Sequence, residues 1–373
     1  MPESKARSDL GASVPAFDGR PKSNAADENG SSPAVRPFHQ FVWDLNWALT
    51  RNSHRPNRLE RTCFRIAQAL VAPVCKFLLR GQPIVLANVW HRPLFLQANH
   101  HLPHIVSANP LWSLPLVHSV HALGKENVQI IDVGANIGDT VALLESHLPG
   151  LCRFLCIEPD DIYYQLCRSN TQHISRVLLR KCFVSDTGSS ALVIDHREPG
   201  TATTRIRSSD GNETPGQQGR TLDEVDAMLG DTAVDLIKID TDGFDYKVLR
   251  SGSNTLKTHR PALFFEWYPQ LWEAQGEDSL QVFDFLRHCG YTSFAFFADN
   301  GFFHALVSLP DIDAIEALRS ATLARSGLDN VYFDVLAAPL DVCKRTIEFN
   351  LQDTVALAKE KQSWWRMQPK HWR

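Results

Sequence analysis

The stretch "IIDVGANIGDT", from Ile130 to Thr140, decides the fold of this chain. Strand-forming residues are followed by an acid, a turn bounded by glycines and a second acid, which is the pattern of a buried strand that passes into a helix. Such turns usually bind a nucleotide, because the amides at the start of the helix face the ligand. The carboxylates of Asp132 and Asp139 narrow down which nucleotide fits.

From Val128 onward, short apolar runs alternate with helical stretches. The runs are "VQIIDVG", "RFLCIEPD", "VLLRKCFVSD", "DLIKID" and "ALFFEW". Continuous apolar strands between helices predict an α/β fold with a parallel sheet of about five strands, covered on both faces. Antiparallel strands then follow, because Asn300-Gly301 predicts a hairpin turn and "VYFDVLA" adds a strand. Residues 185–220 are rich in Gly, Thr, Ser and Pro, which predicts a long crossover with irregular β structure.

The acids favour a cofactor without phosphate. Glu158 ends the second strand, 26 positions after Asp132, where an acid can accept hydrogen bonds from ribose hydroxyls. A dinucleotide needs Gly-x-Gly-x-x-Gly, whereas this turn reads Gly-Ala-Asn-Ile-Gly and places Asp139 near the expected phosphates. Like charges about 4 Å apart repel by several kcal/mol. S-adenosylmethionine, which is cationic, suits these carboxylates; Asp132 and Asp139 also fit a turn former and a helix cap.

Composition excludes several classes of protein. The chain has 373 residues and a net charge of −4, so no basic field indicates a nucleic-acid partner. Its eight cysteines lie mostly in apolar runs and form no Cys-x-x-Cys pair, which indicates reduced thiols in the cytoplasm. We find no signal peptide and no uncharged apolar run long enough to span a membrane.

The composition changes along the chain and predicts four parts. Residues 1–36 are rich in small and polar residues and should be disordered. Residues 37–125 should form a mainly helical accessory region on the substrate side, 126–340 the sheet domain, and 341–373 a C-terminal helix and tail. The tail "WWRMQPKHWR" suits a glycan-stacking or lipid-interface patch, or else packing on its own domain or a homo-oligomer contact.

One helix in the accessory region has a clear apolar face. Its members are Leu59, Cys63, Ile66, Leu70, Val74 and Phe77, which are spaced by three or four positions, whereas Arg58, Arg61 and Arg65 lie outside the face. We interpret it as a core-facing amphipathic helix with a solvated basic side. The alternative is a surface helix that rests on anionic lipid, in which case peripheral membrane contact follows.

A histidine run follows that helix, with His91, His100, His101 and His104. No glutamate accompanies it as in zinc-protease helices, and Pro103 and Pro110 indicate a loop or a broken element. The run therefore favours the polar lining of an acceptor cleft, or a surface loop, over a metal cluster.

Five segments in order resemble the FkbM family of S-adenosylmethionine-dependent methyltransferases. They are "IDVGANIGDT", "CIEPD", "RTLDEV", "DLIKIDTDGFDYKVLRSG" and "PALFFEWYP". The resemblance covers roughly residues 128–269 and is weaker up to 339; the family typically has Glu at the positions of Asp242 and Asp245. It implies a Rossmann-like class I methyltransferase sheet and acceptors that are mostly hydroxyls. The cofactor contacts that it implies are Asp132, Gly134, Asn136, Gly138, Glu158, Ser185 and Asp186.

Methyl transfer to a hydroxyl requires alignment of the acceptor oxygen and removal of its proton. The candidate catalytic residues lie in or directly after the fourth and fifth strands: Asp240, Lys238, Asp242 and Glu266. Lys238 is costly in a buried strand unless its charge is paired, and Asp240, two positions on, is its simplest partner. Asp240 is a base or, with Asp242 or Asp245, part of a divalent metal site; Asp245 also fits a helix cap. His196 and His304 are further candidate bases.

These observations predict an O-methyltransferase that acts on a saccharide or lipid-linked glycan in the cytoplasm. The alternative acceptor is a polyketide or another secondary metabolite. Two other classes remain open: a nicotinamide-dependent oxidoreductase, which the absent third glycine disfavours, and a binding protein that keeps the fold without catalysis.

Overall fold

The computed structural model describes residues 33–52, 58–186, 192–195, 203–206, 219–308, 311–325 and 331–367. Most of the segment predicted to be disordered lies outside these ranges, as do His196 and the last residues of the tail. The structure therefore does not test the predictions for them.

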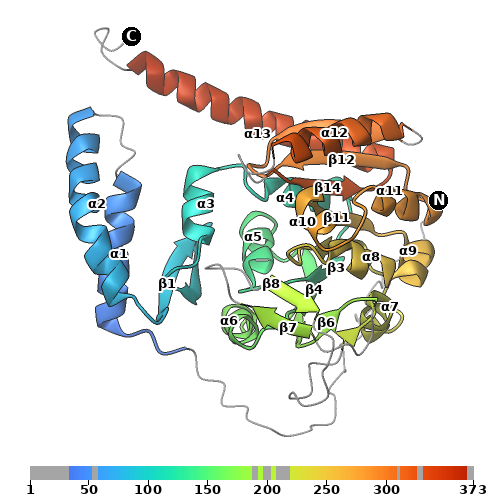
Figure 1. Ribbon diagram of the computed structural model, residues 1–373, viewed down its shortest axis with the longest axis horizontal. Helices are drawn as coiled ribbons and strands as arrows, with labels where there is room; N and C mark the ends of the chain where they lie inside the picture. The colour runs from blue at the N-terminus through green and yellow to red at the C-terminus, as the bar shows by residue number, and fades with distance from the viewer. Residues whose placement is uncertain are drawn as a thin grey trace, which may run out of the picture. The chain divides into compact units, whose positions relative to one another are not determined.

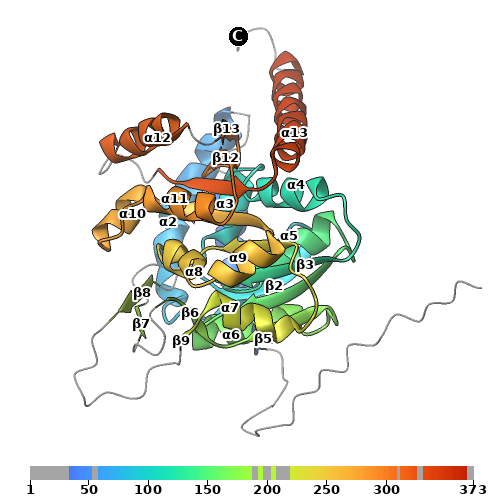
Figure 2. The same cartoon turned by 90° about the vertical axis from the view of Figure 1, so that its right-hand side faces the viewer.

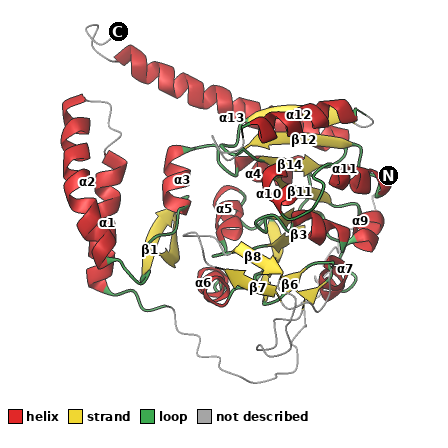
Figure 3. Ribbon diagram, in the orientation of Figure 1, coloured by secondary structure: helices red, strands yellow, loops and turns green. Residues whose placement is uncertain are grey.

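An eight-stranded sheet is the centre of the structure, with the order β13-β12-β14-β11-β10-β3-β4-β5 (Figures 1 and 3). Five adjacent strands are parallel: β3 (Val128–Val133), β4 (Cys152–Ile157), β5 (Val177–Arg180), β10 (Leu236–Ile239) and β11 (Ala262–Trp267). Three strands complete it through antiparallel pairs: β12 (Ser293–Ala298), β13 (Phe303–Ser308) and β14 (Phe333–Ala337). The predicted parallel strands, antiparallel additions and Asn300-Gly301 hairpin are confirmed. The α/β fold with a mostly parallel sheet, which the sequence predicts, is therefore present.

Side chains alternate between the two faces of the sheet, and helices cover both faces. Ile131 and Val133 of β3 pack into the core beneath one helical layer, and Val128 and Ile130 pack into the opposite core. The first layer comprises α7 (Leu222–Asp226), α8 (Asp245–Arg250), α9 (Ser253–His259), α10 (Pro269–Ala274), α11 (Gln281–His288) and α12 (Ile312–Ala324). The second comprises α4 (Leu114–Ala122), α5 (Asp139–His147) and α13 (Leu340–Met367), while α6 (Asp161–Thr171) packs beside α5. Figure 2 shows α8 and α9 side by side on their face of the sheet.

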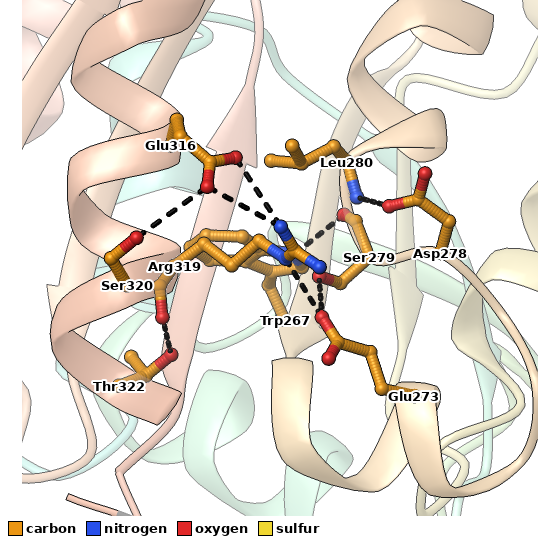
Figure 4. Close-up of polar contacts among 9 residues, drawn as sticks. All are labelled: Trp267, Glu273, Asp278, Ser279, Leu280, Glu316, Arg319, Ser320 and Thr322. Carbon is orange, nitrogen blue, oxygen red and sulfur yellow. Dashed lines mark hydrogen bonds and ion pairs between the residues drawn. The ribbon is translucent and has the colours of Figure 1, made fainter. Parts of the chain in front are cut away.

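A polar cluster joins α10 and α12 beyond the end of β11 (Figure 4). The Arg319 guanidinium donates through Nε to Glu273 Oε1 at 2.7 Å, and the Ser279 hydroxyl donates to the same oxygen at 3.0 Å. The indole nitrogen of Trp267, the last residue of β11, donates to the Ser279 carbonyl at 2.9 Å. These bonds fix the chain where it leaves β11, next to the candidate site residue Glu266.

The crossover after β5 contains short strands, as predicted. β6 (Phe183–Val184) pairs in parallel with β9 (Gly219–Arg220), and β7 (Leu192–Asp195) pairs antiparallel with β8 (Thr203–Ile206). A short 3-10 helix, η1 (Ala227–Leu229), follows α7. The crossover thus contributes β structure that is separate from the main sheet.

The N-terminal region contains helices. It also contains one hairpin, which the sequence did not reveal. Its elements are α1 (Pro37–Asn52), α2 (Arg58–Leu78), β1 (Ile84–Val89), β2 (Arg92–Gln97) and α3 (Leu102–Ala108). Gln40 of α1 bonds both backbone groups of Leu86 in β1, at 3.0 and 2.8 Å. Asn170 of α6 bonds both backbone groups of Phe95 in β2, at 2.8 and 2.9 Å. These paired bonds fasten the hairpin to α1 on one side and to the sheet domain on the other.

The apolar face of α2 is exposed, so the prediction of a core-facing helix is wrong. Leu59 is 73% exposed, Leu70 72% and Phe77 60%. The cause is the order of the layers: Trp43 of α1 packs into the same core as β1, and α2 packs on the outer side of α1. A helix that packs on only one neighbour keeps its opposite face in water.

Candidate active site

The turn after β3 is built so that its backbone meets the end of β10. Gly134 has φ +84°, and a Cβ on it would lie 1.9 Å from the Asp240 carbonyl oxygen, so only glycine fits. Gly138 has φ +83°, and a Cβ on it would lie 2.9 Å from Thr171 Cγ2. The amides of Gly134 and Ala135 both donate to the Ile157 carbonyl at 3.0 Å. These donors are already used within the protein, unlike the free amides of a phosphate-binding turn.

Glu158 holds the next part of the turn. Its carboxylate accepts from the amide of Asn136 at 2.7 Å and from the amide of Asp160 at 2.9 Å. Burial raises the pKa of Glu158 to about 8, although both hydrogen bonds act in the opposite direction. Asp160 in turn caps α6 by accepting from Ile162 and Tyr163. The end of β4 and the start of α6 are therefore fixed to the glycine turn.

A cavity with about 630 Å³ of empty space lies along this turn. Five of the residues proposed from the sequence line it: Gly134, Asn136, Glu158, Asp240 and Asp242. Val184, at the end of β6, lines it as well, and the next two residues are Ser185 and Asp186. Asp186 is paired with Arg250 through a 2.6 Å bond from Nε. Ligands of open α/β sheets bind at this edge, beside the switch between β3 and β10.

Lys238 lies between two carboxylates beneath the turn. Its Nζ is 3.3 Å from Asp132 Oδ1 and 3.3 Å from Asp240 Oδ2, so the predicted Lys238–Asp240 contact is present. The register explains this, because Lys238 on β10 is directly opposite Asp132 on β3. Burial opposes the lysine charge, but Asp132, Asp240 and Asp139 outweigh it and raise the pKa of Lys238 well above its ordinary value. The lysine therefore stays protonated.

Further acids extend this cluster along the same face of the sheet. Glu266 on β11 is opposite Asp334 on β14, and both alternate with residues of the first core. Burial, reinforced by the charge of Asp240, raises the pKa of Asp334 to about 8 and that of Glu266 well above its ordinary range. Burial also raises the pKa of Asp139 to about 6. Asp240 differs from these acids, because its side chain is 54% exposed.

Asp245 acts as a tether at the start of α8. It accepts from the Thr241 hydroxyl at 3.0 Å and from the Glu266 amide at 3.3 Å. It makes no capping bond, since the N-cap of α8 is Phe244, and the interpretation of Asp245 as a helix cap is wrong. Burial raises the pKa of Asp245 to about 8. Its bonds connect the loop after β10 to β11.

The proposed metal ligands do not converge. Within the described ranges, no three His, Cys, Asp or Glu side chains are placed to hold a metal ion. This covers the set Asp240, Asp242 and Asp245 and also the histidine run. His100 bonds Asn136 at 3.2 Å between Nε2 and Oδ1, and burial lowers its pKa to about 4. His304 packs on Phe333, 4.9 Å between ring centroids, and lines a different cavity from the cofactor turn.

A second cavity, with about 420 Å³ of empty space, adjoins the charged cluster. Asp139, Lys238, Asp240 and Asp334 line it together with Trp90 and Trp112. Asp240 also lines the cavity at the glycine turn, so this residue borders both spaces. Trp90 and Trp112 stack, with ring centroids 6.2 Å apart and an interplanar angle of 3°.

Trp90 also lines a large cleft, with about 1360 Å³ of empty space, between α1, the β1–β2 hairpin and α3. Trp43, Trp47 and His91 are among its other lining residues. Trp90 and His91 form the tip of the hairpin at φ +49° and +61°, a conformation that usually holds Asn or Gly. Strained backbone of this kind concentrates at functional sites.

Three of these residues escaped the sequence analysis: Trp90, Trp112 and Asp334. Asp334 had a usable signal, since an acid inside the apolar run "VYFDVLA" is as anomalous as Lys238. Trp90 and Trp112 had none, because tryptophans in an unassigned segment are equally typical of a core.

The sequence from residue 132 to 293 matches the methyltransferase FkbM domain. Residues 132–293 are thus similar to an FkbM methyltransferase domain. The match begins at Asp132 and includes the glycine turn, β10 and β11. No curated protein shows significant sequence similarity to the chain.

Several solved structures are similar to parts of the chain. Methyltransferase FkbM from Methylobacillus flagellatus KT shares 20% identity over 44% of this chain and 36% of its own, with a TM-score of 0.29. This chain thus spans about a third of that protein's length. Precorrin-6y C5,15-methyltransferase from Geobacter metallireducens GS-15 shares 12% identity over 60% of this chain and 86% of its own, with a TM-score of 0.32. The N-terminal domain of human METTL16, in complex with SAH, shares 12% identity over 63% of this chain and 70% of its own, with a TM-score of 0.31. These are partial superpositions, so the family assignment rests on the sequence match.

Proposed function

We propose that the chain is an S-adenosylmethionine-dependent O-methyltransferase that acts on a hydroxyl of a saccharide or lipid-linked glycan. The observation that carries this proposal is the position of Asp240, which has a half-exposed side chain and borders both the cavity at the glycine turn and the cavity that contains Trp90. A group at this position can act on a hydroxyl that enters from one cavity while the methyl donor occupies the other.

The chemistry of the first cavity supports a cationic, phosphate-free cofactor. The amides of residues 134–136 are bonded to Ile157 and Glu158, so they are not available to a pyrophosphate. The acidic lining residues Asp240 and Asp242 favour positive charge instead. S-adenosylmethionine, when bound, would supply a methyl group on a positively charged sulfur. We assign its contacts to Asn136 and Glu158, with Gly134 and Gly138 shaping the turn, Asp132 beneath it and Ser185 and Asp186 beside Val184.

Asp240 is the proposed base for the acceptor hydroxyl. The Asp240 carboxylate would accept the proton of the acceptor hydroxyl, and bound S-adenosylmethionine would supply the methyl group. The other acids of the cluster are poorer bases near neutral pH, because burial keeps Asp334 and Asp245 protonated up to about pH 8. Lys238 holds Asp240 at 3.3 Å and donates to the Gly134 carbonyl, so it positions the base against the cofactor turn. Asp242 lines the same cavity as Asp240, and Glu266 on β11 is the other acid that we assign to the catalytic set.

The lining of the second cavity supports a saccharide acceptor. Trp90 and Trp112 present large rings beside the acids, and the adjoining cleft adds Trp43 and Trp47 with polar groups such as Asn88. Rings that are apolar on their faces, combined with nearby polar groups, suit a ligand with C–H faces and hydroxyl edges. The eight unpaired cysteines support a cytoplasmic location for this activity.

The Asp240→Asn variant tests the role of the base. We expect turnover to fall by about 100-fold or more, because the amide cannot accept the proton, while affinity for S-adenosylhomocysteine changes by less than about threefold. Turnover is measured with labelled cofactor against panels of glycans, lipid-linked glycans and polyketides. Asp161→Asn, at an exposed acid of α6, is the matched control and should retain full activity.

Two outcomes would contradict the proposal. If Asp240→Asn kept full turnover, Asp240 would not be the base. If calorimetry showed NADH, and not S-adenosylhomocysteine, bound at the glycine turn, the oxidoreductase alternative would replace methyl transfer. Transfer of label to polyketides alone would move the acceptor to that class.

A further inference from the structure

The outer face of α2 is a continuous apolar surface in water. We define it by Leu59, Ile66, Leu70, Val74 and Phe77, each between 56% and 73% exposed. The spacing of seven, four, four and three positions places them on one side of the helix along its whole length. An aligned patch of this kind on a soluble surface marks an interaction site, whereas scattered apolar residues do not.

Basic residues accompany this face. Arg65, Lys76 and Arg80 are exposed, and the Arg80 guanidinium lies 4.8 Å above the Phe77 ring. Residues 58–80 contain five basic residues and one acid, a net charge of +4 in a chain whose net charge is −4. All other residues together therefore carry −8. An anionic surface would repel most of the molecule and attract this segment.

The opposite side of α2 is already occupied. Cys75 is buried at 3% exposure, and Gln68 donates to the Thr50 hydroxyl of α1 at 3.0 Å. No element within the described ranges covers the outer face. Three apolar side chains on α1 are also exposed: Phe38, Phe41 and Leu45. Both helices of the α1–α2 pair therefore leave apolar surface uncovered.

We propose that the outer face of α2 docks on an anionic lipid bilayer, with the helix lying in the plane of the interface. Apolar side chains enter the boundary of the acyl chains while Arg65, Lys76 and Arg80 meet lipid phosphates, which is the arrangement of interfacial amphipathic helices. Within the described ranges, no helix is long and apolar enough to cross a membrane, so the contact is peripheral. The proposal does not depend on methyl transfer; together with the proposed function, it favours an acceptor at the membrane surface.

Charge disfavours a second copy of the chain as the partner of this face. A symmetric dimer through α2 would place two segments of net charge +4 against each other. No acidic residue of α2 other than Glu60 is available to offset that repulsion. The same charges attract a bilayer that contains acidic lipids.

Co-sedimentation of the full chain with vesicles tests the proposal. We expect binding to phosphatidylcholine–phosphatidylglycerol vesicles that exceeds binding to phosphatidylcholine alone and weakens with salt. Leu70→Glu should reduce the partition coefficient by about tenfold or more. It removes a leucine that enters the bilayer and adds a negative charge that the anionic lipids repel. Arg65→Gln and Lys76→Gln should each reduce it by about fivefold on anionic vesicles only. Leu351→Glu, at an exposed leucine of α13, is the matched control and should bind as the parent does.

Binding of S-adenosylhomocysteine by each variant shows that its fold is intact and separates this test from that of the proposed function. Absence of binding by the parent chain to anionic vesicles would overturn the proposal. Equal losses for Leu70→Glu and Leu351→Glu would overturn it as well, since the α2 face would then have no special part. A dimer that Leu70→Glu dissociates, without lipid binding, would assign the face to a second copy instead.

Discussion

Apolar side chains are usually buried and charged side chains usually exposed. The outer face of α2 and the C-terminal edge of the sheet depart from this rule in opposite directions. On α2, leucines and a phenylalanine lie in water, whereas at the sheet edge Asp132, Lys238 and Asp245 are buried. Helix α11 also has an apolar face but buries Val282, Phe283 and Leu286 completely. The comparison teaches that a periodic pattern determines which residues share a face, while the layering of the fold determines whether anything covers it.

Each exception has a different physical cost. Buried charges lose hydration and persist only if partners compensate, so the sheet edge depends on its ion pairs. Exposed leucines lose nothing within the monomer but leave the hydrophobic gain unused. Local conflicts of this kind are expected at functional sites. Substitutions at the sheet edge should therefore lower the free energy of unfolding strongly, whereas substitutions on the outer face of α2 should barely change it.

The largest effect is expected for Lys238→Met. The change leaves Asp132 buried without its counter-charge, which should lower the free energy of unfolding by about 3–5 kcal/mol near neutral pH. The loss should be smaller at pH 5 than at pH 8, because burial raises the pKa of Asp132 and the acid can take up a proton. Urea denaturation at both pH values measures this.

Lys125→Met is the control for that experiment. Lys125 is paired with Asp235 at 2.5 Å, but its side chain is 58% exposed. A surface pair contributes less than about 1 kcal/mol. If Lys125→Met cost as much as Lys238→Met, the buried charges at the sheet edge would have no special role in stability.

The presence of the strands and the change from parallel to antiparallel were predictable from the sequence, because the relevant signals are local. Apolar runs predicted the parallel strands, and Asn300-Gly301 predicted the β12–β13 hairpin. The β1–β2 hairpin was missed, since its tip carries Trp90 and His91 in place of the usual Asn and Gly. The exposure of α2 was missed for a different reason: α1 separates it from the core, and no feature within residues 58–78 reveals that.

The candidate site was predictable to the extent that strand ends determine it. Asp132, Lys238 and Asp240 meet because parallel register places β3 beside β10. Asp334 joins them from β14, nearly a hundred positions later in the chain, and its approach to Glu266 depends on a long-range antiparallel pair. Trp90 and Trp112 arrive from outside the FkbM domain, so no pattern within that domain indicates them.

A smaller effect is expected for Asp334→Asn. Burial gives Asp334 a pKa of about 8 in the folded protein, above its ordinary 3.8. A raised acid pKa contributes stability that is complete below pH 3.8 and is lost as pH rises through 8, because the unfolded chain ionises first. Asparagine does not titrate, so the decline of unfolding free energy across that window should become shallower, by up to about 1.4 kcal/mol per pH unit.

Thermal or urea unfolding from pH 4 to pH 9 measures this slope for both proteins. The variant should be the more stable protein at pH 8 and should lose that advantage at pH 4. Parallel curves for the two proteins would show that Asp334 is already ionised in the folded protein and that burial does not keep it protonated.

The smallest effect is expected for Leu70→Ala on the outer face of α2. Leu70 is 72% exposed, and alanine is the better helix former, so the free energy of unfolding should change by less than about 0.5 kcal/mol. The matched change in α11, Leu286→Ala, removes a fully buried side chain and should cost about 2–5 kcal/mol. Equal losses for the two leucines would mean that the α2 face is buried in solution. The comparison between the two helices would then fail, and with it the reason to expect a bilayer there.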